Sequence, residues 1–130
     1  MFAAMLFAIS IVALSQFAVY YWRAMLAGAA GQPISERILA AAGAQDGQLT
    51  GRHFATLLGI HDLTPELNSG SDGLFLVRLY FRVVDMLGRA LPAISAWSQR
   101  ELAVCARYAA VQIDRRWQMN LELAASLRSC

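Results

Sequence analysis

The sequence predicts an all-α protein with a single N-terminal transmembrane helix and a small helical domain of four or five helices, the last of them long. Three observations favour this class. Residues 1–22 contain no charged side chain. Residues 74–91 and 93–127 are rich in apolar residues at helical spacing. Segments rich in glycine, proline and small polar residues separate these stretches.

The first segment, MFAAMLFAISIVALSQFAVYYW, is long enough to cross a bilayer. About 20 apolar residues at ~1.5 Å each span the ~30 Å hydrocarbon core. Tyr20, Tyr21 and Trp22 suit the headgroup level, and Arg23 can reach lipid phosphates. Arg23 and Arg37 follow the span and no arginine precedes it. The positive-inside rule therefore predicts a single-pass protein of the inner (cytoplasmic) membrane with a cytoplasmic C-terminal domain.

Polar and small residues inside this segment predict its packing. We expect the hydroxyls of Ser10 and Ser15 to bond back to helix carbonyls, and the amide of Gln16 to seek a partner helix. Small side chains share one face at helical spacing and permit close approach of another helix. These interaction candidates are Ala4, Ala8, Ser15 and Ala18.

A cleaved signal peptide is the alternative interpretation of this segment. The tripeptide 27–29, Ala-Gly-Ala, matches an A-x-A cleavage pattern. However, no basic region precedes the apolar run, and the run exceeds the usual ~7–15 residues. We therefore favour a retained anchor at residues 1–27, a linker at 28–33 and a helical domain at 34–130.

Shorter helices are predicted between residues 34 and 67. Residues 34–42 would form one, with Ile38 and Leu39 facing inward. Thr50 resembles an N-cap for a second helix that Gly59 ends. The segment 64–66, Thr-Pro-Glu, also predicts a helix start, with a cap, a proline at the first position and an acidic residue in the first turn. Residues 68–73 form the clearest loop, and Ser71 or Asp72 can cap the helix that follows.

Residues 74–91 read as the core helix of the domain. Their charged side chains recur at intervals of four, three and four and so share one narrow stripe. A helix that is apolar elsewhere should be buried on most of its circumference, with Leu79 and Val83 in the core. A second membrane span is disfavoured by the charges, but a helix lying flat on the membrane with its arginines at lipid phosphates is not. The stripe comprises Arg78, Arg82, Asp85 and Arg89.

Pro92 predicts a kink or a turn before the longest helix, residues 93–127. One stripe at helical spacing is apolar along this helix, whereas Arg100, Arg107, Asp114 and Gln118 lie away from it. The apolar stripe comprises Leu102, Ala106, Ala109, Ile113, Trp117, Leu121 and Ala124.

The composition excludes some classes of function but does not identify the function. Hydrophobic residues make up 58% of the chain, above the ~45–50% usual in soluble domains. All eleven basic residues are arginine, and the net charge is only +2, so we expect no nucleic-acid partner. Cys105 and Cys130 lack the spacing of a zinc site or a disulfide framework, and we expect Cys105 to be a buried small hydrophobe.

The sequence contains no nucleophile motif and no phosphate-binding loop, and we predict no catalytic residue, no cofactor and no metal. One group resembles a metal site, but its two histidines lie eight residues apart instead of four. An ordinary turn at residues 61–62 explains it better. The group comprises His53, His61, Asp62 and Glu66.

These features predict a membrane-anchored accessory, scaffold or assembly subunit of a membrane complex. Its expected partners are membrane lipid and other membrane-protein subunits, or further copies of itself. Arg115 and Arg116 are a solvated pair that could dock an acidic partner or a lipid headgroup. Two alternatives stay open: a helical module that binds a lipid or small apolar ligand, and a small metal-dependent enzyme.

Overall fold

The computed structural model describes residues 1–45, 48–64 and 74–130, without the side chains of residues 29 and 30. Within these ranges the chain forms helices and no strand, which confirms the all-α class, the apolar N-terminal helix and the long C-terminal helix. The α-helices are α1 (Phe2–Ala30), α2 (Glu36–Ala41), α3 (Phe54–Leu63), α4 (Leu74–Ala90) and α5 (Ser95–Arg128). Two 3-10 helices, η2 (Gly51–His53) and η3 (Pro92–Ile94), lead into α3 and α5.

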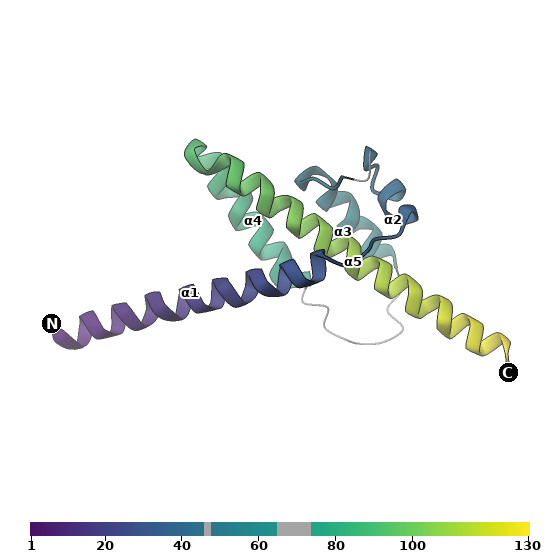
Figure 1. Ribbon diagram of the computed structural model, residues 1–130, viewed down its shortest axis with the longest axis horizontal. Helices are drawn as coiled ribbons and strands as arrows, with labels where there is room; N and C mark the ends of the chain where they lie inside the picture. Colours follow the sequence, from purple (N-terminus) through teal and green to yellow (C-terminus); the bar gives the residue numbers. More distant parts are fainter. Residues whose placement is uncertain (46–47, 65–73) are drawn as a thin grey trace.

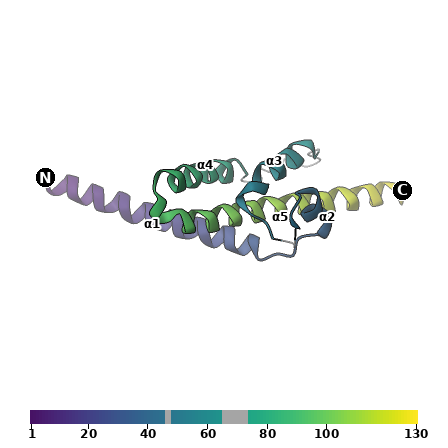
Figure 2. The ribbon, with the colours of Figure 1, turned by 90° about the horizontal axis from the view of Figure 1, so that it is seen from above.

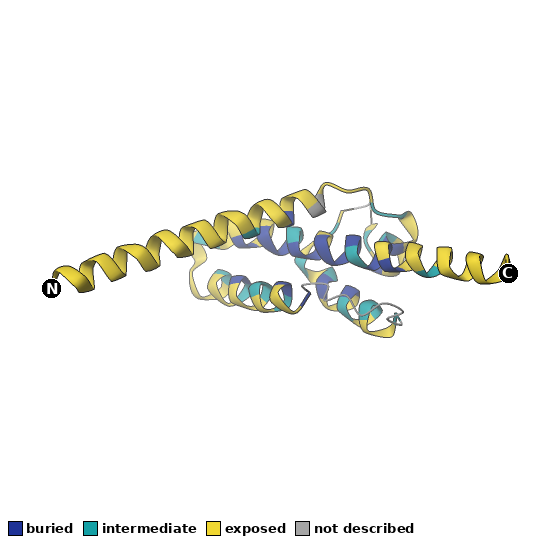
Figure 3. Ribbon diagram, turned by 90° about the horizontal axis from the view of Figure 1, so that it is seen from below, coloured by how far each residue is buried: buried dark blue, intermediate teal, exposed yellow. Residues whose placement is uncertain are grey.

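Helix α5 is the centre of the fold. Figure 2 shows it running between α1 on one side and α3 and α4 on the other. Its middle part carries small side chains, which let several helices approach the same segment closely. Figure 3 shows the buried residues concentrated along this part of α5. The small buried residues are Cys105, Ala106, Ala109 and Ala110.

Helix α1 has two different parts. Most of it projects from the packed helices α2 to α5, which we call the body, with its apolar side chains exposed (Figures 1 and 3). Its last turns pack on α5, and Leu26 is only 1% exposed. The helix also continues to Ala30, so residues 28–30 of the expected linker are helical.

The segment around Thr50 begins a helical stretch, as expected. The Thr50 backbone N–H donates to Nδ1 of His53 at 3.0 Å, which forms a capping box on η2. The prediction that Gly59 ends the helix is wrong, because α3 runs through it to Leu63. A glycine inside a helix costs only about 1 kcal/mol, and the Thr64 hydroxyl closes the helix by donating to the carbonyl of Ile60 at 2.8 Å.

Other local predictions have mixed outcomes. Helix α2 is shorter than the expected 34–42 but buries Ile38, as predicted. The helix start predicted at residues 64–66 includes residues 65 and 66, which lie outside the described residues. The predicted caps Ser71 and Asp72 also lie outside them.

Helix α4 forms where the sequence predicts it, and Pro92 makes a turn. Pro92 opens η3, and α5 then runs back along α4 (Figure 1). The two helices approach closely at Gly88, where an added Cβ would collide with the Ser98 side chain. Phe81 of α4 also stacks on Phe54 of α3, with ring centroids 4.0 Å apart.

The predicted orientation of α4 is wrong. Leu79 is 54% exposed and Val83 44% exposed, whereas Leu74, Val77 and Val84 are buried. The helix carries two apolar arcs with the charged stripe between them on one side, and the close contact with α5 selects the arc containing Val77 and Val84. The core therefore buries only one face of α4, not most of its circumference.

The apolar stripe of α5 also divides into two parts. Leu102, Ala106, Ala109 and Ile113 are buried, as the pattern predicts. Trp117 and Leu121 are exposed, because the end of α5 extends beyond the other helices (Figure 1).

Candidate interaction surfaces

A polar contact joins the apolar helix α1 to the rest of the fold. Arg23 of α1 donates from Nη2 to Oε1 of Glu101 on α5 at 2.8 Å, and the Tyr80 hydroxyl of α4 donates to Oε2 at 2.8 Å. The Glu101 side chain is 7% exposed and the Arg23 side chain 52%. A buried carboxylate needs such partners, because an unpaired buried charge is costly. We call Arg23, Tyr80 and Glu101 the anchor triad.

Aromatic packing reinforces the anchor triad. The rings of Trp22 and Tyr80 meet edge to face, with centroids 6.2 Å apart. Burial raises the pKa of the Tyr80 hydroxyl above its usual value, and the hydrogen bond to Glu101 adds to this effect. Tyr80 therefore stays protonated and keeps donating to the carboxylate. Helices α1, α4 and α5 therefore meet at this point of the fold.

The sequence pattern does not distinguish Glu101 from a solvent-exposed acidic residue. An acidic residue inside a helix usually faces solvent, and its partners lie 78 and 21 residues away. One signal was present: Glu101 stands four residues before Cys105 and so shares its helix face. The sequence predicts that Arg23 reaches lipid phosphates, and it does not predict the ion pair with Glu101.

The polar residues of the apolar helix behave in two ways. The hydroxyls of Ser10 and Ser15 donate to the carbonyls of Leu6 and Val12, each at 2.8 Å, which confirms their expected back-bonding. The Gln16 side chain is exposed along with the small-residue face, so this face is available to another helix. The exposed small residues are Ala4, Ala8, Ser15 and Ala18.

A hollow of about 420 Å³ lies between the end of α3 and the projecting end of α5. Trp117 and Leu121 form its wall on α5, and Ile60 and Leu63 form the wall on α3. Leu63, Trp117 and Leu121 are exposed large apolar side chains. Exposed apolar groups gathered around a hollow are typical of protein contact sites.

The two arginines that precede Trp117 in α5, Arg115 and Arg116, have different environments. Arg115 is exposed. Arg116 is buried, so the expected solvated pair is wrong for this residue. Adjacent residues of an α-helix point to different sides of it. Only Arg115 is therefore open to an acidic partner.

The residues that resembled a metal site have other contacts. Nδ1 of His53 accepts from Thr50 in the capping box, and Asp62 accepts from Arg78 at 2.6 Å. This bond from Arg78 lowers the pKa of the Asp62 carboxyl below its usual value. His61 lies 3.5 Å from Asp62, and Glu66 lies outside the described residues. In the described ranges no three His, Cys, Asp or Glu side chains gather at a point that could hold a metal.

The two cysteines differ in burial. Cys105 is buried at the centre of α5, and burial raises the pKa of its thiol to about 12, with the nearby Glu101 charge as a second cause. Cys130 is exposed. Since the thiolate is the reactive form, Cys105 is an inert packing residue, as predicted.

No protein family, curated protein or solved structure matches this chain.

Proposed function

We propose that the protein is a single-pass membrane-anchored assembly subunit whose body is held rigidly at the membrane. By length and composition, residues 2–28 can cross a bilayer. The observation that carries the proposal is that the same helix belongs to the core of the body, through Leu26 and the anchor triad.

This double role of α1 favours a retained anchor over a cleaved signal peptide. Cleavage after residue 29 would remove Trp22, Arg23 and Leu26 from the body. Glu101 would then lose its ion pair with Arg23, and the core would lose the buried Leu26. Such a change is unfavourable, because burial of Leu26 and the ion pair to Glu101 both stabilise the fold.

The projecting end of α5 is the proposed docking site for a second membrane-protein subunit. It lies at the opposite end of the molecule from the N-terminus of α1 (Figure 1). Its hollow, lined by Trp117 and Leu121, has the dimensions to receive an apolar side chain of a partner helix. Aromatic residues in such positions contribute much of the binding energy at interfaces. Enclosure of a small apolar ligand and metal-dependent catalysis stay predictions from the sequence.

Blue-native electrophoresis of mildly solubilised native membranes tests this proposal. We expect a discrete species well above the 14.2 kDa of one chain, and its loss in the double variant Trp117→Ser, Leu121→Ser. The matched control is Met119→Ser, Leu123→Ser, which changes equally exposed residues on the other side of α5. A band at monomer mass under every gentle condition would contradict the proposal.

A further inference from the structure

We propose that α4 lies in the headgroup region of the same membrane, with its exposed apolar face in the lipid and Arg82 at the lipid phosphates. This inference rests on the proposed anchoring by α1. The exposed face is formed by Phe75, Leu76, Leu79, Val83 and Met86, and we call it the lipid face of α4.

The lipid face is a continuous surface. Residues 75, 79, 83 and 86 follow one another at intervals of four, four and three, which places them on one side of the helix. The buried face, with Val77 and Val84, packs on the body and fixes how α4 is rotated. The stacked rings of Phe54 and Phe81 hold the same orientation. The lipid face therefore cannot turn into the core without breaking these contacts.

The anchor places this face at the level of the membrane surface. Residues 2–21 are about 20 residues, the length that crosses the ~30 Å hydrocarbon core. Trp22 thus stands where α1 leaves the hydrocarbon, and its ring touches Tyr80 in the middle of α4. Since Arg23 is bonded to the same junction, the middle of α4 lies beside the exit point of α1.

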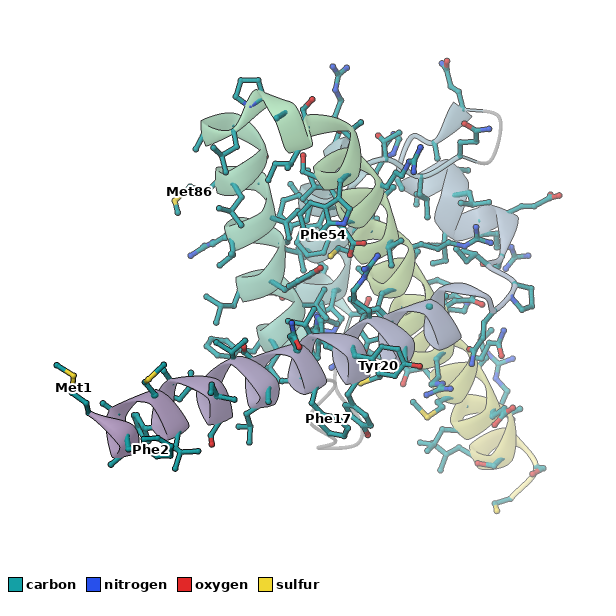
Figure 4. The ribbon with its side chains drawn as sticks, turned by 60° about the vertical axis from the view of Figure 1, so that its left-hand side comes forward. Met1, Phe2, Phe17, Tyr20, Phe54 and Met86 are labelled. Carbon is teal, nitrogen blue, oxygen red and sulfur yellow. The ribbon has the colours of Figure 1, made fainter. Side chains whose placement is uncertain are left out.

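The direction of α4 also fits a position in the membrane plane. Figure 1 shows α4 running across α1, as a helix lying in the membrane plane must if α1 crosses that plane. Figure 4 shows Met86 pointing away from α5, toward the side on which Met1 and Phe2 lie. The lipid face is therefore turned toward the bilayer that α1 enters.

Charge complementarity identifies an anionic lipid surface as the occupant. Arg82 is exposed and lies three or four residues from Leu79 and Met86, so it borders the lipid face. It has no ion-pair partner within the part of the chain that the structure describes, whereas Arg78 and Arg89 pair with Asp62 and Asp85. Interfacial helices typically combine such a basic border with an apolar face buried about 5–10 Å deep.

Spin-label accessibility tests the inference on the full chain, purified and reconstituted in vesicles of zwitterionic and anionic phospholipid. In a Cys130→Ser background, Met86→Cys and Leu79→Cys place the label on the lipid face. Leu127→Cys is the control, since Leu127 is equally exposed but lies near the far end of α5. We expect collisions with a water-soluble nickel complex to fall several-fold at the first two sites relative to Leu127, while collisions with oxygen rise.

A second pair of variants tests the role of charge. With the label at Met86, Arg82→Glu should raise the nickel collision rate, whereas Arg107→Glu, the same charge change on α5, should leave it unchanged. Equal nickel access at positions 86, 79 and 127 would overturn the inference, even if the protein stays in the vesicles through α1. Dipolar broadening between labels at Met86 would also overturn it, because a second copy would then cover the face. Recovery of the protein outside the vesicles would instead contradict the anchoring itself.

Discussion

Among single residues, Glu101 is the one that connects α1 and α4 to α5. It accepts one bond from α1 and one from α4, and its side chain is almost fully removed from water. Arg23 keeps half of its surface open and can be solvated without its partner, whereas Glu101 cannot. The cost of breaking the anchor triad is therefore the cost of leaving this carboxylate unpaired.

Tyr80→Phe removes one bond from the carboxylate and leaves the ring in place. Hydrogen bonds to charged groups contribute about 1.5–3 kcal/mol, and we expect the free energy of unfolding to fall by about this amount. Thermal unfolding in detergent micelles, followed by circular dichroism, measures the change. Tyr20→Phe is the control. Because Tyr20 is exposed on α1, this variant should unfold as the unchanged protein does. Equal melting of all three proteins would refute the role of the Tyr80 hydroxyl.

The cysteines give a prediction about pH. Because the thiol of Cys105 has a pKa raised to about 12 by burial, it should resist alkylation in the folded protein at pH 8, whereas Cys130 reacts. Between pH 9 and about 12, an unfolded chain ionises this thiol and the folded chain does not, so stability should fall as pH rises. Mass spectrometry after timed labelling counts the modified thiols. Rapid labelling of Cys130→Ser without denaturant would show that Cys105 is accessible.

At the scale of elements, α4 shows what a helical pattern can and cannot predict. Its bounds follow from the run of apolar residues and from Pro92. Its orientation does not, because both apolar arcs are rich in leucine, valine and phenylalanine. The contact of Gly88 with Ser98 and the stack of Phe54 on Phe81 select the buried arc, and both involve residues of other elements. Gly59 is a second example, because the sequence does not show that the packing of α3 on α5 outweighs the cost of about 1 kcal/mol for a glycine inside a helix.

Two leucines with opposite environments test this orientation. Leu57 of α3 is fully buried, so Leu57→Ala should cost about 2–5 kcal/mol of unfolding free energy. Leu79→Ala should cost less than about 1 kcal/mol in detergent, as substitutions outside the core usually do. Denaturant titration of the full chain in micelles compares them. A larger loss for Leu79 than for Leu57 would mean that this face of α4 is packed inside the protein.

For the whole molecule, the proposed anchoring divides the described residues into a side facing the membrane and a side away from it. In this proposal the exposed part of α1 and the lipid face of α4 form the first side. The projecting end of α5 forms the second, at the opposite end of the molecule from the N-terminus of α1 (Figure 1). The fold class was predictable, because an uncharged run of 22 residues and two long apolar helices leave few alternatives. The division into two sides was not, since it depends on Arg23, Tyr80 and Glu101 meeting in space.

The candidate metal residues illustrate the same limit. His53, Asp62 and Glu66 are near one another in sequence, which suggested a common site. Instead His53 caps a helix and Asp62 pairs with Arg78, sixteen residues away. Short polar stretches offer many such local partners, and proximity along the chain does not separate a ligand set from helix caps.

In the proposed function, α1 is at once the membrane anchor and part of the body. Intact-mass spectrometry of the protein in carbonate-washed membranes tests it most directly. We predict that the washed membranes retain a chain of about the full 14.2 kDa, with Trp22, Arg23 and Leu26 present. A shortened chain that begins after residue 29 and leaves with the carbonate wash would contradict the account.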